Sequence, residues 1–504
     1  MSEPTSDRSQ LRGFWSLIVT QFQGAFSDNA LKQLAIFVGI SLGLSQAQRD
    51  QLVSLATALL TLPFIIFSMT GGWLANRYSK RTVTIGVKIF EIGIMALATA
   101  GLAYHHLTLV LACVFLMGVH SAIFGPSKYG SLPELLDERR LSWGNGILEL
   151  GTFLAIILGT VAGAILSQRF EQAPLWAGII LIGLATAGLV SSFGITRVPP
   201  ADPTKPFRVN FLGDLWTQIG VMRKDRVLFL AVLGNNFFWF LAVLLSQNII
   251  IYGLDVLRID QTHNGYLQAA LAIGIGVGSF AAGHLSGGKI EYGLIPIGAF
   301  GITLCAGLLA LPALTFLKVA AGLGALGFFA GFYAVPVNAI MQHRPRKEDK
   351  AGVLAAQNLM SSACAFLAAG AYYLMQTVWP RDPSQIFFVT GVLTLAGTAY
   401  AVWLMPDSLL RMLIWFFTHS VYRLRVEGRG NIPEKGGALF VCNHVSFVDA
   451  LLIIGSTDRM IRAVMFKDIY EKWYVKPFAK AMNAIPIRSE EHTSELQSHS
   501  DLVC

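Results

Sequence analysis

Long runs of apolar residues, separated by short polar stretches, dominate the chain up to about residue 405. Most runs hold about 20 residues, the length of α-helix that crosses the hydrocarbon core of a bilayer. The pattern predicts membrane-spanning helices, twelve in number, over residues 14–42, 51–75, 82–104, 107–126, 143–167, 174–195, 227–252, 264–286, 292–314, 319–341, 353–376 and 385–405. The predicted fold class is therefore an all-α polytopic membrane protein.

The composition agrees with this fold class. The 504-residue chain is 54% apolar and only 13% charged, and its mean hydropathy is +0.56. The formal net charge of +8 does not indicate nucleic-acid binding, because the basic residues lie in short connections where lipid headgroups account for them. Cys113, Cys305 and Cys364 fall within apolar runs, and no pair of cysteines has a metal or redox spacing. We therefore expect no metal and no cofactor.

Basic residues in the connections predict the orientation. Lys and Arg follow the second, fourth and tenth predicted spans and are nearly absent after odd-numbered spans. By the positive-inside rule, the amino terminus, the exits of even-numbered spans and the segment after Met405 are cytoplasmic. The longest connection, 197–226, contains four prolines and six basic residues and divides the spans six and six. We predict a transporter domain over residues 1–405, with halves 1–196 and 227–405.

The stretch after the second predicted span reads Gly-Trp-Leu-Ala-Asn-Arg-Tyr-Ser-Lys-Arg over residues 72–81. It resembles the loop signature of the major facilitator superfamily, in which glycine is followed by an Asp-Arg pair and then by glycine and basic residues. The resemblance implies a twelve-helix fold with a 6+6 pseudo-repeat and a gating loop formed by Gly72, Asn76, Arg77, Lys80 and Arg81. Asn76 stands in place of the aspartate, so we expect a hydrogen bond where relatives have a charge interaction. A basic topogenic loop would explain the basic residues equally well.

Three further motifs narrow the resemblance. Residues 26–32 read Phe-Ser-Asp-Asn-Ala-Leu-Lys, residues 125–130 read Gly-Pro-Ser-Lys-Tyr-Gly, and residues 335–339 read Val-Pro-Val-Asn-Ala. Together they resemble the bacterial lysophospholipid transporter family across most of residues 10–405. The resemblance implies a carrier in the bacterial inner membrane that flips lysophospholipids, such as lysophosphatidylethanolamine, inward for reacylation.

Ionisable and amide side chains within the predicted spans are candidates for lining a transport cavity, because charge at membrane depth is costly unless it is paired or hydrated. Asp28 and Lys32 lie one helical turn apart, as do Lys88 and Glu91. A local ion pair that holds helices together is an equally good interpretation of Lys88 with Glu91. The predicted cavity residues are Asp28, Asn29, Lys32, Lys88, Glu91, Lys128, Glu149, Asn338 and Gln357.

The two halves differ in the polar groups of their spans. The second half contributes mainly neutral groups, among them Asn235 and Asn236. Our hypothesis is that the charged first half binds a zwitterionic headgroup while the mostly apolar second half accommodates an acyl chain. Two alternatives stay open. The spans carry another solute, such as a drug or metabolite, or they only anchor an enzyme, which the intramembrane charges argue against.

The pattern changes after Met405. Residues 409–422 form an interrupted aromatic stretch that we predict to be a membrane-surface helix, and residues 437–442 are predicted to be a short buried strand. His444 and Asp449 follow at a five-residue spacing. A histidine can remove the proton from a hydroxyl group while an aspartate orients its ring, which is general-base chemistry. Capping at a strand-to-helix junction is the plainer alternative.

This segment resembles the glycerolipid acyltransferases of the phosphatidic-acid-synthase type. His444 to Asp449 matches their first motif, and residues 485–488, Ile-Pro-Ile-Arg, match their second. The resemblance implies that His444 and Asp449 are catalytic and that the acyl donor is acyl carrier protein or acyl-CoA. The third motif, Phe-Pro-Glu-Gly-Thr, does not occur in the chain. We therefore expect a partial α/β acyltransferase domain over residues 406–488 that is inactive as it stands.

The last residues, 488–504, read RSEEHTSELQSHSDLVC, which matches the in-frame translation of a common sequencing adapter. We therefore expect residues 489–504 not to belong to the natural protein, whereas Arg488 is assignable to either source. The expected parent is longer and joins the transporter to the acyltransferase and then to an acyl-carrier-protein synthetase. Such a fusion would reacylate imported lysophospholipid at the cytoplasmic face.

Overall fold

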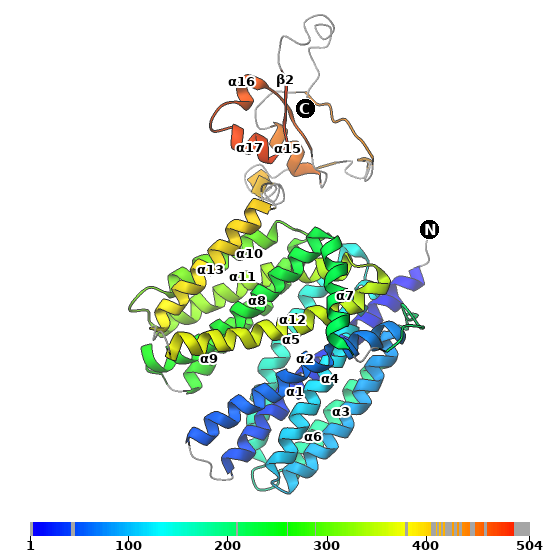
Figure 1. Cartoon of the computed structure of the whole chain (residues 1–504), viewed down its shortest axis with the longest axis vertical. Coiled ribbons are helices and arrows are strands. Elements are labelled where there is room, and N and C mark those ends of the chain that lie inside the picture. The colour runs from blue at the N-terminus through cyan, green and yellow to red at the C-terminus, as the bar shows by residue number, and fades with distance from the viewer. Residues whose placement is uncertain are drawn as a thin grey trace, which may run out of the picture. The chain divides into compact units, whose positions relative to one another are not determined.

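Two bundles of long helices, blue to cyan and green to yellow in Figure 1, make up most of the described chain. The computed structural model describes residues 4–41, 46–207, 210–259, 261–287, 289–377, 382–404, 436–443, 449–457 and 461–487, and a few residues between 410 and 432. The first bundle consists of α1 (Pro4–Ser41), α2 (Gln46–Arg77), α3 (Lys80–Ala103), α4 (Leu107–Leu135), α5 (Glu138–Arg169) and α6 (Leu175–Ser192). The second consists of α8 (Arg226–Ile251), α9 (Gln261–Leu285), α10 (Leu294–Leu309), α11 (Phe316–His343), α12 (Lys347–Thr377) and α13 (Pro383–Leu404).

These helices correspond one to one with the predicted spans, within the part of the chain that the structure describes. Nine of the described helices are long and apolar enough to cross a membrane, and α10 is apolar but shorter. The protein is therefore a multi-pass membrane protein. One π-helical turn, η1 (Tyr252–Val256), continues α8 beyond its predicted end.

Several helices begin or end outside the predicted spans, and one helix lies in a stretch where none is predicted. The fourth span was predicted to end at residue 126, but α4 continues through Pro126 and Pro133 to Leu135. A proline removes one backbone donor, but neighbouring helices and local adjustments make such a loss tolerable in membrane helices. The connection 197–226 also contains a helix, α7 (Phe211–Lys224), which begins where the Asn210 side chain accepts a hydrogen bond from Gly213 N at 2.9 Å.

Each bundle has its own apolar core. In the first, buried residues of α1, α3, α4 and α6 pack together, including Leu31, Met95 and Leu181. In the second, α8 to α11 contribute buried residues such as Leu245, Leu271 and Leu323. Each bundle therefore has buried apolar contacts among its own helices.

The halves meet closely at one end of the bundle. A Cβ atom on Gly146 of α5 would lie 2.5 Å from the carbonyl oxygen of Ser279 on α9, and one on Gly72 of α2 would lie 2.5 Å from the Cβ of Ala355 on α12. Only glycine allows helices to approach this closely. Both crossings lie toward the face where α2, α9 and α11 end and α5 and α12 begin. We call this end of the bundle the linker face, since α7 and its connection also lie there.

A second compact unit consists of Tyr292–Ile297 and Ala396–Cys504. Its described elements are α15 (Asp449–Ser456), β1 (Val464–Phe466), α16 (Lys467–Tyr470), α17 (Lys476–Ala481) and β2 (Ile485–Ile487). β1 and β2 pair in parallel, with Val464 opposite Ile485. Ile414, Ile454, Ile461 and Met482 form its core.

The prediction of a buried strand over residues 437–442 is wrong. These residues form no strand, and Leu439 is 85% exposed. An apolar run becomes a buried strand only beside a pairing partner, and the described sheet consists of β1 and β2 alone. The predicted surface helix over residues 409–422 lies mostly outside the described residues.

Candidate transport site

A buried ion pair lies inside the first half. Lys88 and Glu91 of α3 are fully shielded from solvent, and Lys88 Nζ lies 2.7 Å from Glu91 Oε2. Gln23 of α1 bridges them, because its amide oxygen accepts from Lys88 at 2.7 Å and its amide nitrogen donates to Glu91 at 2.8 Å. A buried pair is tolerated when its remaining polar groups are hydrogen-bonded. This geometry favours the interpretation of Lys88 with Glu91 as an ion pair that joins α1 to α3.

His120 of α4, which the sequence analysis did not single out, extends this network toward Asp28. Its Nε2 lies 3.3 Å from Glu91 Oε2, and its Nδ1 lies 3.4 Å from Ser121 Oγ. Ser121 Oγ donates to Asp28 Oδ2 at 2.6 Å, while Asp28 Oδ1 is shielded and has no hydrogen-bond partner among the described residues. The sequence does contain a signal for His120, because it is an ionisable residue within an apolar span, as the predicted cavity residues are.

A second polar group lies between the halves. Asn338 Nδ2 of α11 donates to Glu149 Oε1 of α5 at 3.1 Å, and Tyr129 Oη lies 3.5 Å from the same oxygen. Lys128 Nζ lies 4.5 Å from the centre of the Tyr129 ring and interacts electrostatically with both Glu149 and Asp28. Lys32 also interacts with Asp28. The structure thus brings together a set of predicted cavity residues, which we call the charged cluster: Asp28, Lys32, Lys128, Glu149 and Asn338.

Besides Lys88 and Glu91, two predicted cavity residues, Asn29 and Gln357, form hydrogen bonds outside the charged cluster. Asn29 Nδ2 donates to the carbonyl oxygen of Ala25 on its own helix at 2.8 Å. Gln357 Nε2 donates to Ser361 Oγ at 2.8 Å in the second half. The same hydroxyl group accepts from Asn235 at 3.1 Å and donates to Asn236 at 2.9 Å. This second cluster is neutral throughout, as the difference between the halves predicts.

The start of the predicted gating loop is attached to the linker. Trp73 Nε1 and Arg77 donate to the carbonyl oxygen of Lys205 at 3.0 and 2.8 Å. Asn76 is fully buried, and its carbonyl oxygen accepts from Asp202 N at 3.0 Å. Its side-chain amide, however, has no hydrogen-bond partner in the described parts of the chain. The hydrogen bond expected from the Asn76 side chain is therefore not found.

The rest of the loop is attached to the first half. Lys80 pairs with Glu134 of α4, and Arg81 donates to the carbonyl oxygen of Phe193 at 2.7 Å. The basic residues of the loop thus make local contacts in this conformation. Gly72 alone of the predicted loop residues sits at a crossing between the halves, against Ala355.

A reciprocal amide pair, which the sequence did not reveal, joins the halves near the linker face. Asn145 Nδ2 of α5 donates to Gln342 Oε1 of α11 at 3.0 Å, and Gln342 Nε2 donates to Asn145 Oδ1 at 2.7 Å. Both side chains are buried. Nearby, His343 Nε2 lies 3.3 Å from Glu138 Oε1. The halves are therefore held together by polar contacts at the linker face.

Comparison with known proteins identifies the family. The profile described as Major Facilitator Superfamily matches residues 17–369. The lysophospholipid transporter LplT of Escherichia coli O9:H4 is 30% identical over 413 residues, which cover 80% of this chain and 99% of that protein. LplT of Citrobacter koseri is 29% identical over 401 residues, covering 78% and 96%. The chain belongs to the lysophospholipid transporter family of the major facilitator superfamily.

Solved structures confirm the major facilitator fold of this lysophospholipid transporter family member. The human organic anion transporter MFSD10 aligns with a TM-score of 0.61 at 14% identity, covering 79% of this chain and all of that one. The transporter FucP in its outward conformation aligns with a TM-score of 0.62 at 13% identity, covering 78% and 99%. At these identities the likeness concerns the fold alone.

The segment after the transporter matches the family described as Acyltransferase over residues 423–503. His444 and Arg488 lie outside the described residues, so the geometry of the predicted His444–Asp449 pair stays a prediction. Asp449 is the first residue of α15, and Ile485 to Ile487 of the second motif form β2.

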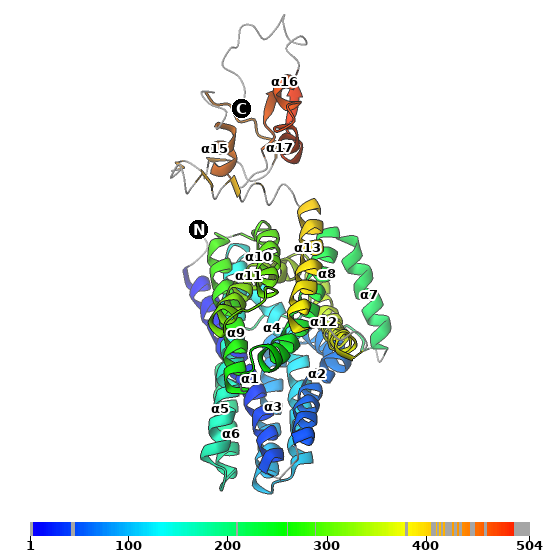
Figure 2. The same cartoon turned by 90° about the vertical axis from the view of Figure 1, so that its left-hand side faces the viewer.

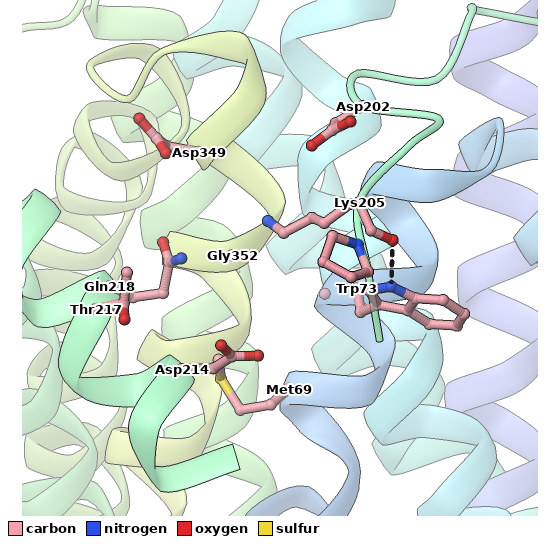
Figure 3. A pocket seen from close by; sticks show the side chains of 11 residues that line it. Met69, Trp73, Asp202, Lys205, Asp214, Thr217, Gln218, Asp349 and Gly352 are labelled. Carbon is pink, nitrogen blue, oxygen red and sulfur yellow. Dashed lines mark hydrogen bonds between the residues drawn. The ribbon is translucent and has the colours of Figure 1, made fainter. Parts of the chain in front are cut away.

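A cavity of about 280 Å³ opens at the linker face of the transporter. Figure 3 shows Lys205 reaching from the linker toward Gln218 of α7, with Asp214 and Met69 on the other side of the cavity. None of its lining residues belongs to the charged cluster. The cavity is thus a separate feature, formed where the linker, α2, α7 and α12 meet.

Proposed function

We propose that this protein carries lysophospholipid, of the lysophosphatidylethanolamine type, across the bacterial inner membrane to the cytoplasmic leaflet. Relatives that the chain covers almost completely are named lysophospholipid transporters. The charge distribution supports an orientation with both the linker face and the segment after Met405 in the cytoplasm.

The observation that carries this proposal is the charged cluster. Within it, Lys128 interacts electrostatically with two carboxylates, Asp28 and Glu149, and Asn338 from the other half donates to Glu149. A zwitterionic headgroup has complementary charges: its ammonium group would bind a carboxylate and its phosphate Lys128. The apolar second half would accommodate the acyl chain. Since the cluster draws on both halves, headgroup binding would be sensitive to their relative movement.

Uptake of labelled lysophosphatidylethanolamine into spheroplasts tests the proposal. We expect Asp28→Asn and Glu149→Gln each to lower the initial rate roughly 10-fold or more, because a hydrogen bond to a charged group is worth about 1.5–3 kcal/mol. Glu171→Gln is the matched control, since Glu171 is an exposed carboxylate in the connection between α5 and α6. Uptake that survived both cluster substitutions would contradict the assignment. If the chain took up a drug or metabolite and unlabelled lysophospholipid did not inhibit that uptake, the alternative solute would be favoured.

We further propose that the full-length protein couples import to reacylation. His444 would act as general base on the lysolipid hydroxyl group, Asp449 would orient its ring, and acyl carrier protein or acyl-CoA would supply the acyl group. The match of residues 423–503 to the acyltransferase family supports this coupling.

Sequencing the source gene across the codons for Ile487 and Arg488 tests the proposed coupling. A frame that continues into a Phe-Pro-Glu-Gly-like motif makes His444→Ala the decisive variant, which should abolish acylation and leave uptake intact. A frame that encodes residues 489–504 and stops favours an inactive remnant.

A further inference from the structure

The helix α7 presents large apolar side chains outward. Phe211 is 39% exposed, Leu212 54% and Trp216 66%, and Leu212 and Trp216 lie one helical turn apart. The exposed charged residues of α7 are Arg223 and Lys224, both in its last turn. A cluster of exposed apolar residues that includes tryptophan marks a surface for a partner or a membrane.

Two polar side chains of α7, by contrast, face the bundle. Asp214 and Gln218 line the cavity of Figure 3, and Gln218 is only 7% exposed. Gln218 packs on α12, because a Cβ atom on Gly352 would lie 2.7 Å from its amide carbon. A helix on the surface of a soluble protein has the opposite arrangement, with polar groups outward. The outer surroundings of α7 are therefore apolar or interfacial.

The end of α7 lies at the level where a span begins. Only Asp225 separates Lys224 from Arg226, the first residue of the candidate span α8. The Arg223 guanidinium lies 5.8 Å from the ring centre of Phe229, within the first turn of α8. Figure 2 shows α7 on the outer flank of the bundle, beside α8 and α12. At about 1.5 Å per residue, Trp216 is only about 12 Å along the helix from Lys224.

We infer that α7 is an interfacial helix that binds an anionic phospholipid surface. Phe211, Leu212 and Trp216 enter the boundary between headgroups and acyl chains, where aromatic side chains are favoured. Arg223 and Lys224 bind anionic headgroups. Through Gln218 on Gly352, the bound helix braces α12 at its crossing with α2. The leaflet on the linker side is thereby coupled to the contact between the halves, whatever solute the transporter carries.

Fluorescence quenching of the full chain in anionic phosphatidylglycerol vesicles tests the lipid contact. The chain has ten tryptophans, so the contribution of Trp216 is the difference between the wild type and Trp216→Phe. We expect this contribution to be quenched by bromine atoms near the top of the acyl chains and little affected by aqueous acrylamide. Trp73→Phe is the control, since Trp73 lines the cavity and bonds the Lys205 carbonyl group, and its contribution should be insensitive to brominated lipid. Quenching of Trp216 by acrylamide alone overturns the inference, because the side chain is then in water. Quenching by neither reagent also overturns it, because protein then covers the helix.

The charge contribution is tested on the same helix. In phosphatidylglycerol vesicles, Arg223→Gln with Lys224→Gln should reduce bromine quenching of Trp216 to the level that the wild type shows in phosphatidylcholine. Arg139→Gln with Arg140→Gln, an exposed basic pair on α5, should leave it unchanged. Equal quenching in both lipids, or no effect of the α7 substitutions, would overturn the assignment of Arg223 and Lys224 to anionic headgroups.

Discussion

Asp225 has two roles at the start of α8. Its Oδ1 caps the helix by accepting from Val227 N and Leu228 N at 3.0 and 3.2 Å. Its Oδ2 accepts from Arg344 Nε at 2.7 Å, and this bond holds the pKa of the Asp225 carboxyl below its usual range. The folded state thus favours the charged carboxylate. The stabilisation is present above the unfolded pKa of about 3.9 and is lost as the pH falls through the lower folded pKa.

We predict that Asp225→Asn, which keeps a good cap and removes the charge, lowers the thermal unfolding temperature at neutral pH. The difference from the wild type should begin to shrink as the pH falls below about 4, and it should vanish only below the lowered pKa of the folded state, where the wild-type carboxyl is also neutral. Asp225→Ala removes the cap as well and should cost roughly 1 kcal/mol more. Thermal unfolding in detergent across this pH range measures both effects. A gap between the wild type and the Asn variant that persisted at acid pH would contradict the role of the charge.

Residue identity indicated much of the charged cluster but not its bonding. Asp28 and Glu149 could be singled out because charge within an apolar span is costly, whereas Lys128 lies beyond the predicted fourth span and belongs to the motif at residues 125–130. The hydrogen bonds of Asp28 and Glu149 to Ser121 and Asn338 could not be predicted, because these partners come from other helices and the contacts depend on how the helices pack. The fully buried Lys88–Glu91 pair illustrates the same limit. Its spacing predicted the pair, but only the packing of α1 shows that Gln23 completes it.

The crossing of α2 with α12 depends on one helical glycine. We predict that Gly72→Ala lowers the free energy of unfolding by about 1–3 kcal/mol, because the new Cβ atom would overlap Ala355 and push the helices apart. Gly93→Ala is the matched control, since no atom lies within 4 Å of a Cβ atom built on this exposed glycine of α3. It should be neutral or slightly stabilising. Unfolding temperatures measure both variants, and equal values for Gly72→Ala and the wild type would show that this crossing tolerates separation.

Helices long enough to span a membrane were predictable one by one, and α7 was not. Each span is recognisable in the sequence as a run of about 20 mainly apolar residues. The fourteen residues of α7 follow a proline-rich stretch and mix polar with apolar residues, so their pattern fits a linker as well as a helix. The surroundings of α7 explain why it is helical: its Gln218 side chain packs on Gly352 of α12, and Asn210 caps its first turn. Residues 437–442 show the converse, an apolar run that forms no strand without a partner.

At the scale of the whole molecule, the division into halves followed from the linker, but their conformation did not. Basic connections and a long linker fix which spans belong together. They do not say at which face the halves touch, because that depends on contacts such as Asn145 with Gln342, which are far apart in the sequence. The structure places these contacts at the linker face. A carrier that releases its cargo at this face must break them.

This requirement gives a prediction for the complete transporter. In a chain whose natural cysteines are replaced, a short bis(methanethiosulfonate) reagent should link Asn145→Cys to Gln342→Cys through a disulfide at each end. This link should hold the halves together and abolish lysophospholipid uptake, and a thiol reductant, which cleaves both disulfides, should restore uptake. Asp225→Cys with Arg344→Cys is the matched control, because it joins two positions on the linker side of one half, which move together. Uptake should then survive cross-linking. If the link between residues 145 and 342 formed fully and uptake continued, cargo would reach the linker side without separation of α5 from α11. A mechanism in which the halves separate at the linker face would then be excluded for this transporter.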